Sequence, residues 1–169
     1  MSRTSRLVSA CLFATAISAV ALDSWPVRLD GLGPVQMGME LPELNKALHT
    51  AYSKPADRDE QPCFYVSVPH RPGVGIMILD GHVARIDVDD NQTRTAEGIR
   101  KGDSETKALK VYGAGLKVTP SAYQPESGHF LTMLSRDRKY GIRFETENGI
   151  IVRYYAGTAR AIAFIEGCE

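Results

Sequence analysis

Residues 140–155 read YGIRFETENGIIVRYY, which is the sequence of a β-hairpin. Asn-Gly between two alternating apolar segments is the strongest short-range signal for such a turn. With a two-residue loop, Phe144 would share a face with Arg153, whereas a three-residue loop separates the apolar from the charged side chains. We therefore predict a three-residue loop that ends in Gly149, with Gly149 in the left-handed region. This register places Ile142, Phe144 and Thr146 on one face with Ile150, Val152 and Tyr154.

A second hairpin of the same kind lies 68 positions earlier, where residues 72–88 read PGVGIMILDGHVARIDV. Its turn is marked by Asp80 and Gly81. The same register joins Val74, Ile76 and Ile78 to Ala84, Ile86 and Val88. Arg85 and Arg153 then occupy equivalent places on the opposite face of the two hairpins.

Each hairpin is preceded by a helix and a strand. Residues 38–48 read GMELPELNKAL, with leucines at helical spacing and Pro42 in the first turn, where a missing N–H costs nothing. Residues 102–113 read GDSETKALKVYG, with Asp103 or Ser104 as the N-cap and Gly113 as the stop. Strands are predicted at 63–68 and 130–134, and a last strand at 162–165.

The order of elements predicts an α+β fold built from two similar repeats, each a helix followed by antiparallel strands, packed as one sheet-containing unit. Residues 22–92 form the first repeat and residues 93–169 the second. The connection at 89–95 reads DDNQTRT and is short and polar.

Residues 1–21 are predicted to be a cleaved signal peptide. Arg3 and Arg6 precede an apolar run that ends in Ala19-Val20-Ala21, the small residues required at a cleavage site. A membrane anchor is the alternative, but the run is shorter than the ~20 residues that span a bilayer, so no span remains after cleavage. Lipidation at Cys11 is less favoured because too few residues separate it from Arg6. The mature protein is expected in the periplasm or outside the cell.

Cleavage would leave two cysteines, Cys63 and Cys168, and an even pair in an exported chain predicts one disulfide. This bond would join the two repeats. Closing so long a loop removes ~4.7 kcal/mol of unfolded-chain entropy in the chain-entropy model. Two free or metal-bound thiols are the alternative, although neither cysteine has a second ligand at zinc-binding spacing.

The charge balance excludes one class of partner. The 169 residues include 20 Lys and Arg against 20 Asp and Glu, so there is no basic surface of the kind that binds nucleic acid. Hydrophobic residues make up 43%, which suffices for a buried core.

The two glycine-initiated helices, at residues 38–48 and 102–113, each followed by strands, resemble the superfamily that includes the outer-membrane assembly lipoproteins SmpA/OmlA and the tandem-repeat β-lactamase inhibitor proteins (BLIP-like). The resemblance covers nearly the whole mature chain as an order of elements. It implies a protein that acts by binding other proteins, without chemistry of its own. No family contact residue falls on a matched position.

No motif of catalysis or metal binding is complete. Ser104 stands in a Gly-Asp-Ser triplet found in one esterase family, but no Asp-x-x-His follows it, and helix capping explains the residue. Residues 87–91 offer alternating oxygen ligands, yet the glycine and glutamate of a calcium loop are absent. The histidines lack metal-binding spacing; they are His49, His70, His82 and His129. We therefore expect no catalytic residue, metal or cofactor.

Arginines and tyrosines of the hairpins are the best candidates for a binding surface, because this mixture is enriched at recognition sites. One of the consecutive Tyr154 and Tyr155 must point away from the core. The residues selected are Arg85, Arg143, Arg153, Tyr154 and Tyr155. They predict a non-enzymatic protein that recognises or inhibits a protein partner in the cell envelope. A carbohydrate-binding, lectin-like module is the alternative, and a serine hydrolase using Ser104 is a minor one. Shielding of the sheet is an equally good explanation of the aromatics.

Overall fold

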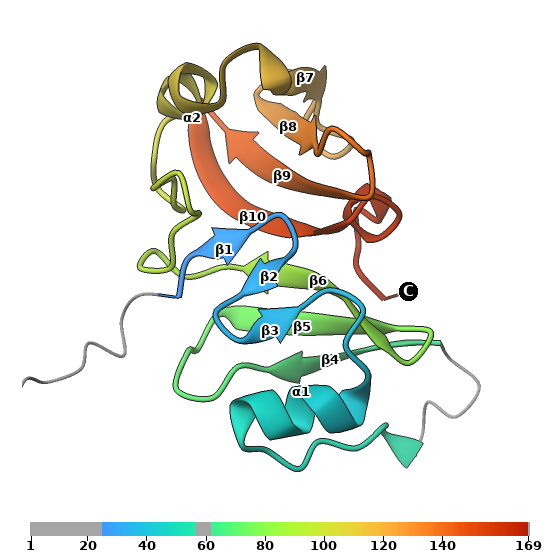
Figure 1. Cartoon of the computed structure of the whole chain (residues 1–169). Helices are drawn as coiled ribbons and strands as arrows, with labels where there is room; N and C mark the ends of the chain where they lie inside the picture. The colour runs from blue at the N-terminus through green and yellow to red at the C-terminus, as the bar shows by residue number, and fades with distance from the viewer. Residues whose placement is uncertain (1–24, 57–61, 169) are drawn as a thin grey trace, which may run out of the picture.

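The computed structural model describes residues 25–56 and 62–168 and shows a mixed α+β fold with two antiparallel sheets (Figure 1). The larger sheet has seven strands in the order β4-β5-β6-β10-β9-β8-β7, and every neighbouring pair is antiparallel. Its strands are β4 (Cys63–Ser67), β5 (Val74–Leu79), β6 (His82–Val88), β7 (Lys117–Pro120), β8 (Gly128–Leu134), β9 (Tyr140–Glu147) and β10 (Ile150–Thr158). The smaller sheet comprises β1 (Val27–Arg28), β2 (Gly31–Leu32) and β3 (Val35–Gln36).

One helix precedes the strands of each half of the large sheet, and the two helices have equal length. Helix α1 (Leu41–Leu48) begins with Pro42 in its first turn, and the Glu43 carboxylate accepts a hydrogen bond of 2.9 Å from the Glu40 N–H. Helix α2 (Glu105–Tyr112) is capped by Ser104, whose Oγ accepts from the Lys107 N–H at 3.1 Å. It ends at Gly113, where the 3₁₀ turn η2 (Gly113–Gly115) begins. The predicted positions of Pro42, of the Ser104 cap and of the Gly113 stop are therefore confirmed. The strands predicted at 63–68 and 130–134 are confirmed as β4 and β8.

Both hairpins have a two-residue loop, so the predicted three-residue loop is wrong. Glu147 pairs with Ile150, which leaves Asn148 and Gly149 as the loop, both with positive φ (49° and 76°), as a type I′ turn requires. Val152 is then bulged out of the ladder between Ile151 and Arg153. The bulge adds one residue to β10, so the residues beyond it lie on the faces that were predicted. Phe144 and Tyr154 share one face, and Arg153 lies on the other.

The β5–β6 hairpin has the same form. Leu79 pairs with His82 across Asp80 and Gly81, whose φ values are 53° and 82°, and the skipped residue is Ala84. Two consequences correct the predicted faces. Val83 and not Ala84 shares the face of Ile78, and Ile151 and not Ile150 shares the face of Thr146.

The start of each helix is tied to the hairpin that follows it by the same backbone contacts. The N–H of Gly38 donates to the carbonyl of Val83, and the N–H of Gly102 donates to that of Ile151, both at 2.8 Å. Both glycines have a φ of 89°, a conformation that other residues rarely adopt. Isolated bridges add the pairs Glu40–His82 and Ser104–Ile150.

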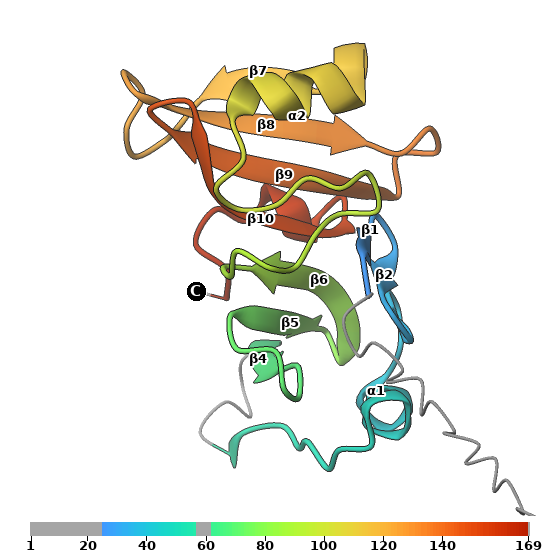
Figure 2. The ribbon, with the colours of Figure 1, turned by 90° about the vertical axis from the view of Figure 1, so that its left-hand side faces the viewer.

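One face of the large sheet forms the main core. Four side chains from adjacent strands on this face are fully buried: Ile76, Ile86, Tyr154 and Phe144. Both helices and the small sheet cover it, with their buried side chains in the same cluster. We call the opposite side of the large sheet the outer face. Figure 2 shows the strands following one another from β4 to β8, with β6 and β10 in the middle.

The C-terminal segment crosses the outer face, and the strand predicted at 162–165 is wrong. Residues 161–163 form the 3₁₀ turn η3 (Ala161–Ala163), which contacts β6, β9 and β10. The main-chain carbonyls of this segment bind a side chain and not a neighbouring strand. The Arg85 guanidinium donates to the carbonyls of Ala161 and Phe164 at 3.0 and 2.6 Å. We call residues 159–168 the C-terminal strap.

The predicted disulfide is confirmed. Cys63 at the start of β4 is bonded to Cys168 at the end of the strap, with Cα atoms 5.3 Å apart. The bond attaches the strap to the first half of the sheet.

Within the described residues, no helix is long and apolar enough to cross a membrane. The predicted signal peptide, residues 1–21, lies outside them.

Candidate functional site

The outer face is richest in charged side chains where the two halves of the sheet meet, at β6 and β10. Asp87 lies opposite Tyr155, and Tyr155 lies opposite Arg143 on the next strand. Arg153 lies opposite Glu145 in the adjacent row. Because side chains alternate along a strand, all five project from the same face. The register therefore brings Arg85, Arg143, Arg153 and Tyr155, which the sequence selected, to one side of the sheet.

Arg85 is at the centre of a buried polar network and is only 2% exposed. Its guanidinium holds Asp87 in a bidentate contact, with distances of 2.9 and 2.8 Å, and donates to the Tyr65 hydroxyl at 2.7 Å. Together with the two strap carbonyls, these contacts satisfy the buried charge. Burial by itself lowers the pKa of Arg85, but the hydrogen bonds and charge of Asp87 raise it above its usual value. Arg85 thus locks the strap to the sheet and is not available to a partner.

Tyr155 is buried between Arg85 and the neighbouring strand, so the expectation of an exposed tyrosine here is wrong. It is 1% exposed, and the Arg85 guanidinium lies 4.3 Å from its ring centroid. Burial raises the pKa of its hydroxyl. The Arg85 guanidinium, which also holds the strap, lies over the ring and shields it from solvent.

Tyr154 points the other way, into the main core. It is fully buried, its ring lies 5.6 Å from that of Phe144, and its hydroxyl donates to the Thr93 carbonyl at 3.1 Å. Its selection as a surface residue is therefore wrong. Alternation along β10 requires one of the two tyrosines to face the core, and the register decides that it is Tyr154.

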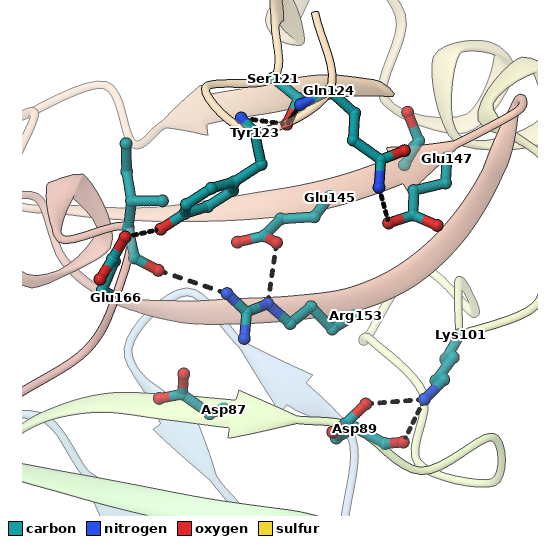
Figure 3. Close-up of polar contacts among 12 residues, drawn as sticks. Asp87, Asp89, Lys101, Ser121, Tyr123, Gln124, Glu145, Glu147, Arg153 and Glu166 are labelled. Atoms are coloured by element: carbon teal, nitrogen blue, oxygen red, sulfur yellow. Dashed lines mark hydrogen bonds and ion pairs between the residues drawn. The ribbon is translucent and has the colours of Figure 1, made fainter. Parts of the chain in front are cut away.

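Arg153 remains accessible and is held in place. Its Nε donates to Glu145 at 2.8 Å and its Nη2 to the Ile165 carbonyl at 3.3 Å, while 43% of the side chain stays exposed (Figure 3). The hydrogen bond with Glu145 raises the pKa of Arg153. Nearby, the Tyr123 hydroxyl donates to Glu166, which connects the β7–β8 loop to the strap.

Arg143 is the second accessible arginine of this face. Its Nε donates to the Thr132 hydroxyl at 2.9 Å, and its guanidinium lies 5.2 Å from the ring centroid of Phe130. Both contacts come from β8, the next strand in the sheet. We call Arg143, Arg153 and the side chains that hold them, Phe130, Thr132 and Glu145, the arginine surface.

Sequence reasoning missed the partners of these arginines. Tyr65, Phe130 and Glu145 were not selected, although Glu145 stands two residues from Arg143 and therefore on the same face of its strand. That spacing could have identified Glu145. The contacts of Tyr65 could not be foreseen, because they depend on which strands are neighbours.

A pocket of about 650 Å³ adjoins the strap at the disulfide end of the sheet. It lies between the strap, Tyr123 and the start of β4, with Phe164, Ile165 and the disulfide among its walls. Its lining is mostly apolar. Tyr123, which is 54% exposed, forms its rim.

The other candidate groups have local structural roles. Ser104 caps α2, and the nearby His129 ring contacts the Glu105 carboxylate at 2.9 Å. In the acidic segment, Asp87 binds Arg85, Asp89 binds Lys101 at 2.6 Å, and Asp90 accepts backbone hydrogen bonds. Among the described residues, no group of three His, Cys, Asp or Glu side chains is arranged to hold a metal ion.

Comparison of the chain with models of protein families, with curated proteins and with solved structures finds no significant match.

Proposed function

We propose that this protein is an exported, non-catalytic binding protein that recognises a protein partner through the arginine surface. The single observation that supports it best is the geometry of Arg143 and Arg153. Both are fixed by neighbouring side chains and still reach solvent. Arginine is among the residues that dominate binding energy at protein interfaces, and a side chain held in place before binding loses less entropy on association.

We also propose that the two halves are repeats of one module, as in the SmpA/OmlA and BLIP-like superfamily. Several independent features support this. The turns, the bulges at Ala84 and Val152, the glycines at the helix starts and their backbone contacts recur at a nearly constant offset. Unrelated hairpins would not share a turn type, a bulge position and a helix contact together.

The disulfide supports export, because such bonds persist in oxidising compartments and are rare in the cytosol. Mass spectrometry of the protein isolated from its source, intact and after reduction, tests this. A mature N-terminus at Leu22 and a mass that increases by two hydrogens on reduction are expected. A retained N-terminal segment would contradict cleavage before Leu22. An acylated Cys11 would contradict it as well and would show that the protein is a lipoprotein.

The interaction itself is tested by cross-linking the purified mature protein in an extract of the cell envelope. The captured protein is then purified and its affinity measured directly. Replacing both Arg143 and Arg153 with Ala should weaken binding at least about tenfold. The matched control replaces Arg136 and Arg138, which are exposed in the β8–β9 turn. A partner that binds the double variant as well as the parent, or no captured partner at all, would contradict the proposal.

The two alternatives receive less support. A lectin-like site built on Tyr155 would need an open ring face, but that ring is covered by Arg85. A hydrolase would need Ser104 as its nucleophile, but its Oγ accepts the capping hydrogen bond of α2. Ester turnover that disappears in Ser104→Ala while the fold is retained would revive the second alternative.

A further inference from the structure

A second pocket lies at the other end of β5 from the strap, beside the connection between the two halves. Its volume is about 1020 Å³, and its lining combines apolar side chains with polar and charged ones. Three separate segments form it: the β4–β5 turn with His70 and Arg71, the connection with Arg94 and Arg100, and Trp25 at the start of the described chain. We call it the linker pocket. It contains none of the residues of the arginine surface.

Two cations of the linker pocket, Arg94 and Arg100, are not held in ion pairs within the described part of the chain. Within residues 25–56 and 62–168, neither Arg94 nor Arg100 forms an ion pair, whereas Arg28, Arg85, Arg153 and Arg160 all do. The guanidinium groups of Arg94 and Arg100 donate to the main-chain carbonyls of Gly98 and Asn91, at 3.5 and 3.3 Å, while the Arg100 main-chain N–H donates to Asp103 at 3.0 Å. The guanidinium contacts are long hydrogen bonds to neutral acceptors, so most of the donor capacity of the two guanidinium groups remains.

One carboxylate does line this pocket, and its oxygens are already engaged. Asp90 Oδ1 accepts from the N–H groups of Gln92 and Thr93, both at 2.7 Å, and Oδ2 accepts from the Thr93 hydroxyl at 2.8 Å. These bonds shape the turn that starts the connection. Asp90 reduces the positive charge of the pocket without forming an ion pair with Arg94 or Arg100.

Trp25 gives the pocket a rigid wall. A Cβ atom on Gly33 would come within 2.3 Å of the indole, so Gly33 packs directly against one side of the ring. The Arg71 guanidinium lies 5.2 Å from the ring centroid. The pocket thus combines fixed aromatic packing with cationic groups from two parts of the chain.

We propose that the linker pocket binds the oxyanion group of a small ligand, a phosphate, sulfate or carboxylate, through Arg94 and Arg100. Guanidinium groups form paired, charge-assisted hydrogen bonds with such groups, and these bonds are stronger than those to neutral acceptors. The volume exceeds that of a single phosphate, so the oxyanion would be part of a larger molecule. Two sources share this chemistry, a soluble anion and the headgroup of an anionic lipid.

The test titrates the disulfide-bonded mature protein with inorganic phosphate and with citrate, following amide chemical shifts by NMR at low ionic strength. Saturable shifts at residues 90–100 are expected. The double variant Arg94→Ala/Arg100→Ala should bind at least about tenfold more weakly. Arg136→Ala is the matched control and should bind like the parent. Thermal unfolding of all variants verifies that they fold.

A second arm separates the two sources. Vesicles of phosphatidylglycerol in phosphatidylcholine are sedimented with the parent and with the double variant. Sedimentation that requires Arg94 and Arg100 supports a lipid headgroup, and saturable binding of phosphate or citrate without sedimentation supports a soluble oxyanion. No saturable binding in either arm, or binding that the double variant retains, would overturn the proposal.

Discussion

Arg85 in the first half and Arg153 in the second half occupy equivalent positions, one residue after the bulge of each hairpin. Their surroundings differ greatly. Arg85 is 2% exposed and bonded to Asp87, Tyr65 and the strap, whereas the Arg153 side chain is 43% exposed. Nothing in the local backbone produces this difference. It arises because the strap, attached to the first half by the disulfide, lies over one arginine and only touches the other.

An arginine at the same position of two similar hairpins therefore has two different roles. In the first half, the Arg85 guanidinium binds the strap to the sheet and stabilises the fold. In the second half it is held by Glu145 and remains at the surface, where it can contribute to recognition.

The difference in role between Arg85 and Arg153 should appear most strongly in the free energy of unfolding. Arg85→Met leaves the Asp87 carboxylate without its buried partner and should lower the free energy of unfolding by about 3–5 kcal/mol. The matched change Arg153→Met should cost less, about 1–2 kcal/mol, because the Arg153 side chain is 43% exposed and only its partner Glu145 is buried. Urea denaturation of both variants at neutral pH measures the difference. Similar losses from the two substitutions would show that the arginines are equivalent after all.

Removing the disulfide should have the next largest effect. The double substitution Cys63→Ala/Cys168→Ala should lower the free energy of unfolding by about 2–4 kcal/mol, because the unfolded chain regains the entropy of an open loop. Limited proteolysis should then cleave within residues 159–168 before any other segment. Cleavage that begins in the second half instead would mean that the strap does not depend on this bond.

The helix starts provide a matched pair in which equal effects are expected. Gly38→Ala and Gly102→Ala each place a side chain at a φ of 89° and should each cost about 1–2 kcal/mol. A Cβ atom at either position meets nothing within 4 Å, so the cost comes from the backbone alone. Thermal unfolding should give the same shift for both variants. A clear difference between them would weaken the proposed repeat.

The smallest effect concerns Tyr65 in the network of Arg85. Burial, followed by the nearby Asp87 charge, raises the pKa of Tyr65 to about 12 from the usual 10.0. The native state therefore holds this proton more tightly than the unfolded chain does. The resulting stability is present below pH 10 and is lost as the pH rises towards 12.

Because Tyr65 is 39% exposed, this contribution should be only about 1 kcal/mol after allowance for solvent screening. Tyr65→Phe should flatten the dependence of stability on pH over this interval. Denaturation at several alkaline pH values measures it, with absorbance of the phenolate as an independent titration. An unchanged slope in the variant would assign the alkaline loss to other tyrosines.

Local signals predicted most of the secondary structure. These signals act through their own backbone and their nearest neighbours, so their effects can be predicted without knowledge of the fold. They are Ser104, Gly113, Pro42 and the two Xaa-Gly turns. The loop length was missed for a physical reason. Beyond the bulge, a two-residue loop with a bulge and a three-residue loop without one place the same residues on the same face. They differ only next to the turn, so alternation along most of the strand does not distinguish them.

The candidate site could be predicted only in part. The sequence selected the right strands and three arginines that share a face, but it assigned Tyr154 and Tyr155 to a surface that neither reaches. Burial of Tyr155 depends on a segment that follows it and folds back over the sheet, and such a contact leaves no periodic signal.

Local backbone preferences suffice to predict the helices, the positions of the turns and the α+β class, and a count of cysteines suffices to predict the bond between Cys63 and Cys168. Contacts between distant segments are needed to bring β6 and β10 together at the centre of one sheet and to lay the strap over Arg85. They also gather Arg94 and Arg100 beside Trp25 in one pocket. These outcomes depend on contacts between distant segments, whose energies arise only when the chain has folded.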